Sequence, residues 1–122
     1  MDVRTTPLFT VTLKVPKIQN LGKTPLGERR VAAVAGGSFE GPKLRGTVEE
    51  GGSDWILARP DGALQLDVRL TLKTDDGHLI GMTYRGFLHG PAAVIERLNR
   101  IVTVALGHRL PEGPVYRVFE VL

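Results

Sequence analysis

The chain has 122 residues and a mass of 13.3 kDa, so we expect a single domain over residues 1–122. Its 42% hydrophobic and 24% charged residues and its net charge of +3 are typical of a globular protein, and the lack of cysteine excludes disulfide scaffolds, thiolate metal sites and cysteine nucleophiles. The N-terminal residues contain no apolar core of a signal peptide, so we expect a cytoplasmic protein.

Short apolar runs separated by glycine and proline predict an all-β protein. The run Leu64 to Lys73 gives the clearest signal, because five aliphatic residues alternate with five polar ones and one face of the strand can be buried. Asp76-Gly77 predicts a hairpin turn, since glycine adopts positive φ without penalty. In chain order, the expected strands are residues 8–15, 30–35, 44–49, 54–59, 64–73, 78–87, 101–106 and 115–121.

One segment, residues 90–100, departs from the strand pattern and predicts a short helix. Pro91 suits the first helical position, and Val94 and Leu98 are four residues apart and would share a face. Eight strands and one short helix predict a closed antiparallel β-barrel, with a β-sandwich as the alternative. A barrel of this size encloses either packed side chains or one small ligand.

A series of short motifs spans nearly the whole chain in an order that also occurs in a known family. The motifs are Gly27-Glu28-Arg29-Arg30, Gly36-Gly37-Ser38-Phe39-Glu40-Gly41-Pro42, Leu44-Arg45-Gly46-Thr47-Val48, Gly51-Gly52-Ser53-Asp54-Trp55, Asp61-Gly62, Leu66-Asp67-Val68-Arg69, Thr74-Asp75-Asp76-Gly77, Tyr84-Arg85-Gly86, Asn99-Arg100-Ile101-Val102, Gly107-His108-Arg109 and Tyr116-Arg117-Val118. They resemble the family known as domain of unknown function 3237, or uncharacterised protein family 0311. The resemblance implies an allene-oxide-cyclase-like antiparallel barrel with a central cavity, and it implies no particular activity.

The sequence departs from this family just before Asn99. Family members usually carry a further strand-length segment between the short helix and the Leu-Asn-Arg stretch, whereas here Leu98-Asn99-Arg100 follows the helix directly. Such a loss either shortens the barrel by a strand or leaves an open sheet edge, which invites pairing with another chain. We therefore expect a homo-oligomer.

Asp67 and Arg69 are candidate catalytic residues on one face of the strand Leu64 to Lys73. A carboxylate can transfer protons, and a guanidinium can hold a carboxylate or enolate oxygen in bidentate geometry. An alternating strand normally buries its apolar side, so the favoured interpretation places both residues on the solvated outside of the barrel. Catalysis by this pair requires the polar face to line the lumen instead.

Four further residues are candidates for a ligand site. Asp54 could act as a base if its surroundings raise its pKa, and Trp55 could form a flat cavity wall. The alternatives are that Asp54 caps the preceding glycine turn and that Trp55 is the main core aromatic. Glu40 is either an acid at the barrel mouth or a surface turn residue. Tyr84 lies on an apolar face, so its buried hydroxyl would need a ligand or a structural hydrogen-bond partner.

Several other functions are disfavoured by the sequence. Three scattered histidines lack the spacing of metal ligands, and no phosphate-binding loop or dinucleotide fingerprint is present, so we expect neither metal nor cofactor. Aromatic and basic residues do not alternate along the chain, so we expect no nucleic-acid partner, and no membrane partner is expected either.

Three functional hypotheses remain open. The first is a cofactor-independent isomerase, cyclase or hydratase that binds a small organic molecule in the barrel lumen. In it Asp54 or Asp67 would move protons, Arg69 would hold an anionic oxygen, and Trp55 and Tyr84 would shape the pocket. The second is a non-catalytic, lipocalin-like ligand binder, and the third is a self-assembling structural module without a ligand.

Overall fold

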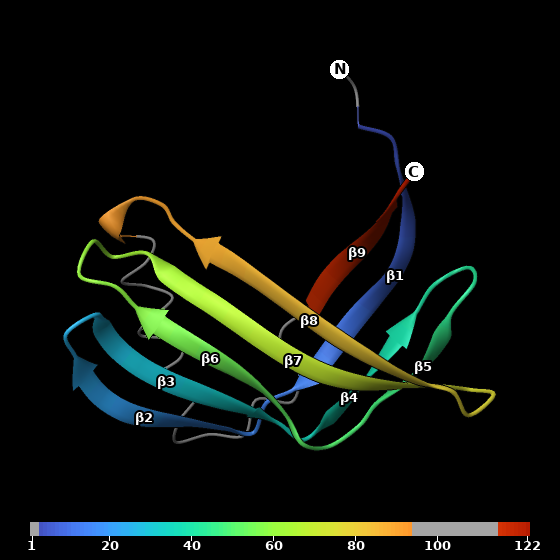
Figure 1. Cartoon of the computed structure of the whole chain (residues 1–122), viewed down its shortest axis with the longest axis horizontal. Helices are drawn as coiled ribbons and strands as arrows, with labels where there is room; N and C mark the ends of the chain where they lie inside the picture. The colour runs from blue at the N-terminus through green and yellow to red at the C-terminus, as the bar shows by residue number, and fades with distance from the viewer. Residues whose placement is uncertain (1–2, 94–114) are drawn as a thin grey trace.

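The computed structural model describes residues 3–93 and 115–122, which form nine strands (Figure 1). All strand pairs are antiparallel, which confirms the all-β prediction. The strands are β1 (Thr5–Lys14), β2 (Lys17–Thr24), β3 (Gly27–Val34), β4 (Gly36–Glu40), β5 (Arg45–Val48), β6 (Gly52–Ala58), β7 (Leu64–Thr74), β8 (Leu79–Leu88) and β9 (Val115–Val121).

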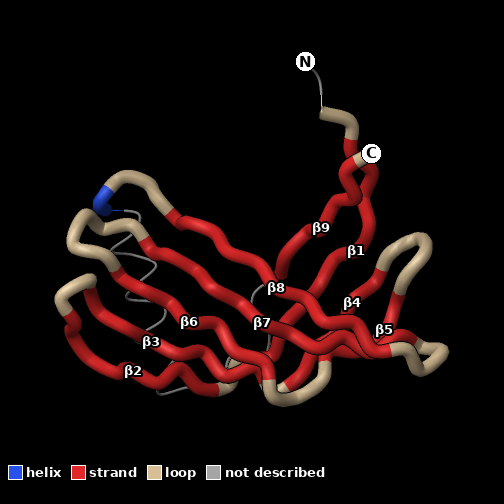
Figure 2. The backbone as a smooth tube through the Cα atoms, in the orientation of Figure 1, coloured by secondary structure: helices blue, strands red, loops and turns tan. Residues whose placement is uncertain are grey.

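Strand β7 organises the sheet because it pairs with three other strands. Its first half pairs with β6 and its last residues pair with β5, while β8 runs along β7 over ten residue pairs. Two limbs therefore diverge from β7, one continuing through β6, β3 and β2 and the other through β5, β4, β1 and β9 (Figure 2). Within the described residues no ladder joins β8 to β9, so the expected closed barrel is a curved sheet that stays open there.

The core lies on one side of the curved sheet, here called the inner face, and the opposite side is the outer face. The alternation along β7 sets this division, since every second residue from Leu64 to Thr74 is buried. Val68 and Leu72 are 0% exposed, and the rings of Phe9 and Phe39 pack at 5.2 Å between centroids. Burying each such side chain contributes about 1.5–3 kcal/mol, so this layer is the main source of stability.

Two strands were missed by the sequence-based prediction. Strand β2 is mostly polar and mostly exposed, and its two aliphatic residues do not alternate with polar ones, so it lacks the apolar alternation by which a strand is detected. Strand β4 begins at Gly36 and Gly37, although paired glycines are more often found in turns. At Gly37 an added Cβ would lie 2.1 Å from the Thr12 carbonyl oxygen, so glycine is needed because β1 and β4 approach closely.

The other elements follow the sequence closely where the structure describes them. Gly77 has φ of +94° in the turn between β7 and β8, which confirms the Asp76-Gly77 hairpin. Ala92 and Ala93 are helical, but the rest of the expected helix and the expected strand 101–106 lie outside the described residues. None of the helical residues described forms a segment long and apolar enough to cross a membrane.

Candidate functional site

The structure divides the predicted site residues between the two faces of the sheet. Residues directly opposite each other share a face, and Val68 of the core lies opposite Asp54 on β6 and opposite Tyr84 on β8. Asp54 and Tyr84 therefore project to the inner face, on either side of Val68. Asp67 and Arg69 alternate with Val68 and project to the outer face, as the favoured interpretation of their alternation predicted.

Asp54 is a mostly buried carboxyl group with one hydrogen bond. Its Oδ1 accepts a hydrogen bond from the backbone N–H of Asp67 at 3.2 Å. Burial raises the pKa of Asp54 to about 6, and the negative charge of Asp67 adds to this rise, whereas the hydrogen bond from the Asp67 N–H opposes it. The carboxyl group therefore exchanges protons close to neutral pH, which is the property that a general acid or base requires.

The hydrogen bond of Asp54 fills a break in the ladder between β6 and β7. Ser53 pairs with Arg69 and Leu57 pairs with Gln65, but Trp55 and the next residue, between these pairs, have no partner in the ladder. In this break the carboxylate of Asp54 accepts from the backbone of Asp67, and the Arg29 guanidinium donates to the Trp55 carbonyl oxygen at 3.3 Å. Side chains thus satisfy backbone groups that the ladder leaves open.

Tyr84 and Tyr116 bring two phenol groups to the same face. Tyr116 lies on β9 opposite Val11, and its ring meets that of Tyr84 edge-on with 5.4 Å between centroids. The Tyr84 hydroxyl is buried and has no hydrogen-bond partner of normal geometry among the described residues. Burial raises the pKa of both phenols, with further contributions from the charge of Asp54, and for Tyr84 also from Tyr116. Both phenols are therefore neutral hydrogen-bond donors at physiological pH.

Tyr116 was not identified as a site residue from the sequence, although its strand was predicted. Tyr116 and Val118 are two residues apart and therefore project to the same side of the predicted strand, which could have placed Tyr116 on an apolar face. Its approach to Tyr84 could not be foreseen, because the two tyrosines lie on strands that share no ladder in the described sheet. The inner-face cluster is therefore Asp54, Tyr84 and Tyr116.

A second polar group on the inner face is already internally paired. Arg30 donates to Glu28 at 2.7 Å, and the Asn20 amide donates to the other carboxylate oxygen of Glu28 at 2.9 Å. The hydrogen bond from Asn20, followed by that from Arg30, lowers the pKa of Glu28. Glu28 therefore stays ionised at neutral pH and pairs with Arg30. Asp54 is the inner-face carboxyl group that exchanges a proton close to neutral pH.

The outer face holds three more of the candidates, Trp55, Asp67 and Arg69, which together line a shallow pocket of about 250 Å³. Trp55 is 47% exposed, so the interpretation that it is the main core aromatic is wrong. Its indole Nε1 donates to the Ser53 hydroxyl at 3.2 Å. Asp67 faces Arg85 across the β7–β8 ladder, with 3.9 Å between carboxylate and guanidinium.

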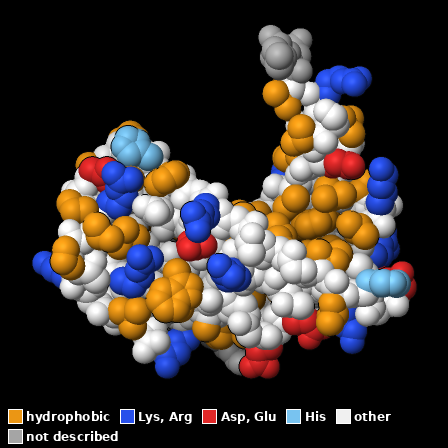
Figure 3. All heavy atoms as spheres, viewed as in Figure 1, with side chains coloured by type: hydrophobic (Ala, Val, Ile, Leu, Met, Phe, Trp, Pro, Cys, Tyr) orange, Lys and Arg blue, Asp and Glu red, His pale blue; other side chains and the backbone are white. Residues whose placement is uncertain are grey.

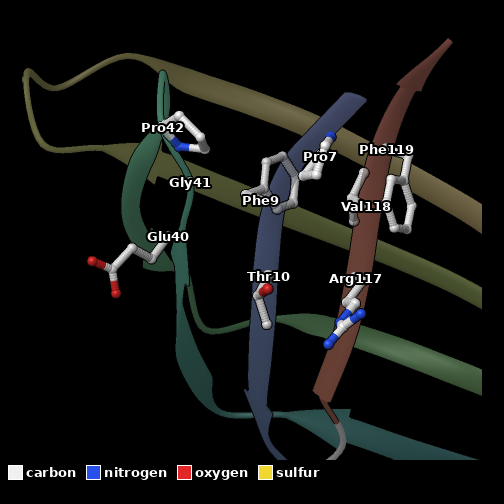
Figure 4. Close-up of a pocket in the computed structure, with 9 residues that line it drawn as sticks. All are labelled: Pro7, Phe9, Thr10, Glu40, Gly41, Pro42, Arg117, Val118 and Phe119. Atoms are coloured by element: carbon white, nitrogen blue, oxygen red, sulfur yellow. The ribbon is translucent and has the colours of Figure 1, made fainter. Parts of the chain in front are cut away.

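Glu40 lies apart from both groups, at the end of β4. It borders a pocket of about 310 Å³ formed by β1, β4 and β9, lined also by Phe9, Thr10 and Arg117 (Figure 4). Its carboxylate points away from Thr10 in this view, is strongly exposed and lies 4.0 Å from Arg45. These features agree with the interpretation of Glu40 as a surface residue.

The described residues contain no group of three or more histidine, aspartate or glutamate side chains that could hold a metal ion. His78 lies in the exposed turn after β7, where its Nδ1 is 3.2 Å from Asp76. His89 is also exposed, and His108 lies outside the described residues.

Fold and site together define a class: an all-β, barrel-like protein with a carboxyl group and two phenols on its concave inner face. The chain belongs to the family described as Protein of unknown function (DUF3237), which matches residues 3–100. A UPF0311 protein of Rhodopseudomonas palustris is 28% identical over 93 residues, which cover 76% of this chain and 61% of that protein. The chain thus matches about three fifths of the length of this relative.

Solved structures support the same architecture. A β-barrel-like protein of Acinetobacter baumannii superimposes with a TM-score of 0.71 and 29% identity, covering 99% of this chain and 77% of that chain. A protein described as an enzyme from Penicillium herquei superimposes with a TM-score of 0.71, covering 100% of this chain and 96% of that chain. Its identity of 16% relates the two proteins by fold alone.

Proposed function

We propose that the inner face binds a small, uncharged organic carbonyl compound and catalyses its isomerisation by proton transfer, without a cofactor. A single observation carries this proposal: Asp54, a buried carboxyl whose pKa is raised to about 6, lies on the same face as two neutral phenols. A carboxylate base with a pKa of about 6, mostly ionised at pH 7, and a pair of hydrogen-bond donors are the groups that enolisation needs.

The proposed step assigns one role to each side chain. The Asp54 carboxylate takes a proton from the carbon next to the carbonyl group, and the electron pair of the broken C–H bond moves into the new enolate. The phenol O–H groups of Tyr84 and Tyr116 donate hydrogen bonds to the enolate oxygen and stabilise its charge. Asp54 then returns the proton to a different carbon, so the product is an isomer of the substrate and the enzyme regains its starting state.

The buried hydroxyl of Tyr84 supports this assignment. A buried hydroxyl without a partner costs about 1–3 kcal/mol, and the described residues give the Tyr84 hydroxyl no hydrogen-bond partner of normal geometry. A substrate oxygen would satisfy this donor. The description of the Penicillium herquei protein as an enzyme is compatible with catalysis on this fold.

Deuterium exchange tests the proposal with a panel of candidate substrates. Small cyclic ketones and enones are incubated with the protein in D₂O, and deuterium uptake beside the carbonyl group is measured by mass spectrometry. We expect uptake that depends on the protein, and we expect Asp54→Asn to slow it by about 100-fold or more. Asp75→Asn is the matched control, because Asp75 is exposed in the turn after β7.

The non-catalytic alternative gives a different result in the same experiment. A lipocalin-like binder would retain ligands from the panel, detected by shifts in the NMR spectrum, without accelerating their exchange. Binding without exchange in the wild-type protein would therefore replace the enzyme with a ligand carrier. Equal exchange rates for wild type and Asp54→Asn would remove Asp54 from the mechanism.

A further inference from the structure

The outer face of β2, β3, β6, β7 and β8 collects positive charge that is scattered in the sequence. The ladder registers place Lys17, Arg29, Arg69, Lys73 and Arg85 on this face, and Asp67 is the one acidic residue that these strands place there. Basic side chains gather around an acidic one over β6, β7 and β8 (Figure 3). A face with five cations and one carboxylate attracts anions.

Trp55 adds an exposed aromatic surface to this positive face. It is 47% exposed, although a tryptophan of a folded domain usually buries most of its large side chain. The hydrogen bond from its Nε1 to Ser53 restricts rotation of the indole. The carbonyl oxygen of Trp55 is held by Arg29, so both its backbone and its ring are fixed. A fixed, exposed indole costs little entropy when a planar molecule stacks on it.

Arg69 is the cation best placed to act together with Trp55. Both residues line the pocket of about 250 Å³. Arg69 also lines an adjoining pocket of about 330 Å³, together with Asp67, Thr83, Tyr84 and Arg85. No carboxylate of the described residues lies within ion-pairing distance of Arg69, whereas Arg85 faces Asp67 at 3.9 Å. An unpaired guanidinium beside a flat apolar wall presents two N–H donors to a planar acceptor.

We propose that this outer surface, formed by Trp55, Asp67, Arg69 and Arg85, binds a planar aromatic carboxylate. The carboxylate group of the ligand pairs with the Arg69 guanidinium, and its ring stacks on the indole of Trp55. The negative charge of Asp67 repels the carboxylate of the ligand. The surface therefore accepts only ligands whose carboxylate lies next to Arg69 and away from Asp67. The side chains of this surface project from the face opposite the inner-face cluster, although Tyr84 also borders the adjoining pocket. The proposed binding of a carboxylate does not depend on the proposed isomerase.

The chain contains a single tryptophan, which makes the test specific to the site. The probe is 2-naphthoate, and the readout is the one indole N–H signal in the ¹H–¹⁵N NMR spectrum. We expect a saturable shift of this signal. Arg69→Gln should weaken binding by about 10-fold or more, because a charge-assisted hydrogen-bonded pair is lost. Asp67→Asn should strengthen binding several-fold, because it removes a repulsive charge.

Matched ligands and variants decide whether both halves of the site act. Arg45→Gln, an exposed arginine on β5, should leave binding unchanged, and so should Tyr116→Phe on the inner face. The uncharged 2-naphthylmethanol and the ring-saturated cyclohexanecarboxylate should each bind at least about 5-fold more weakly than 2-naphthoate. Equal binding of either analogue, or an unchanged affinity in Arg69→Gln, would overturn the proposal. Displacement of 2-naphthoate by a ten-nucleotide oligothymidylate at far lower concentration would also overturn it and would assign the surface to single-stranded nucleic acid.

Discussion

The carboxylate of Asp54 accepts a hydrogen bond from the backbone N–H of Asp67 at 3.2 Å, although the two side chains project from opposite faces of the sheet. The bond crosses the break in the β6–β7 ladder and lies between the inner-face cluster and the outer surface. Asp67 acts on Asp54 in two opposed ways, since its N–H lowers the pKa of Asp54 and its charge raises it. Burial raises the pKa most and outweighs the hydrogen bond, so Asp54 is a weaker acid than an exposed aspartate.

The raised pKa of Asp54 predicts a dependence of stability on pH. Its pKa rises from 3.8 to about 6 on folding, so between these values the folded protein binds more protons than the unfolded chain. The contribution to the free energy of unfolding is therefore fully present below about pH 3.8 and is lost as the pH rises through 6. Its full size is about 3 kcal/mol.

Asp54→Asn isolates this contribution, because an amide keeps a hydrogen-bond acceptor and does not titrate. We expect the variant to be more stable than wild type at pH 7 and to match it more closely at pH 4, as measured by urea unfolding. Asp75→Asn should show no such pH-dependent difference from wild type. A difference between Asp54→Asn and wild type that stays constant from pH 4 to 7 would contradict the raised pKa.

Tyr84→Phe should separate a functional hydroxyl from a structural one. The variant removes a buried O–H that has no hydrogen-bond partner of normal geometry among the described residues, so we expect the free energy of unfolding to stay the same or to rise by about 1 kcal/mol. Deuterium exchange of bound ketones should fall at the same time, because a donor to the enolate oxygen is lost. A loss of stability above about 2 kcal/mol would mean that the hydroxyl supports the fold.

The sequence contains enough information to predict the centre of the fold but not its periphery. The alternation from Leu64 to Lys73 predicted β7, its buried face and the hairpin to β8, because period two follows directly from strand geometry. Strand β2 escaped prediction because its stability comes from pairing with β3 and not from an apolar pattern. Strand β4 was not predicted because its glycines usually indicate a turn. Here a glycine is needed at Gly37 because β4 and β1 approach each other closely.

The candidate site was predicted in parts that the fold then rearranged. Asp54 and Tyr84 were both identified, but their position on either side of Val68 depends on ladder registers that one sequence does not reveal. The assignment of Asp67 and Arg69 to the outside followed from the leucines that alternate with them. Of the two interpretations of Trp55, the one that made it the main core aromatic was wrong: size and rarity favour burial, whereas the ladder places Trp55 on the side opposite the core.

Self-association stays a prediction that solution measurements can test. Strands β2, β8 and β9 each pair with one other strand among the described residues, and a strand with an unpaired edge can pair with another chain. We expect sedimentation velocity to show a species larger than 13.3 kDa whose fraction grows with protein concentration. A single monomeric species over the whole concentration range would exclude association through these edges.

Two glycine-to-alanine substitutions should have opposite effects on stability. At Gly46, on β5, an added Cβ would lie 2.0 Å from the carbonyl oxygen of Lys73, so Gly46→Ala must separate β5 from β7 where one limb of the sheet joins β7. We expect a loss of about 3 kcal/mol or more in the free energy of unfolding, measured with urea.

At Gly81, on β8, an added Cβ meets nothing within 4 Å. Gly81→Ala should therefore stabilise the protein by about 0.5 kcal/mol, because alanine lowers the conformational entropy of the unfolded chain. Equal stabilities of the two variants would show that β5 does not depend on close contact with β7.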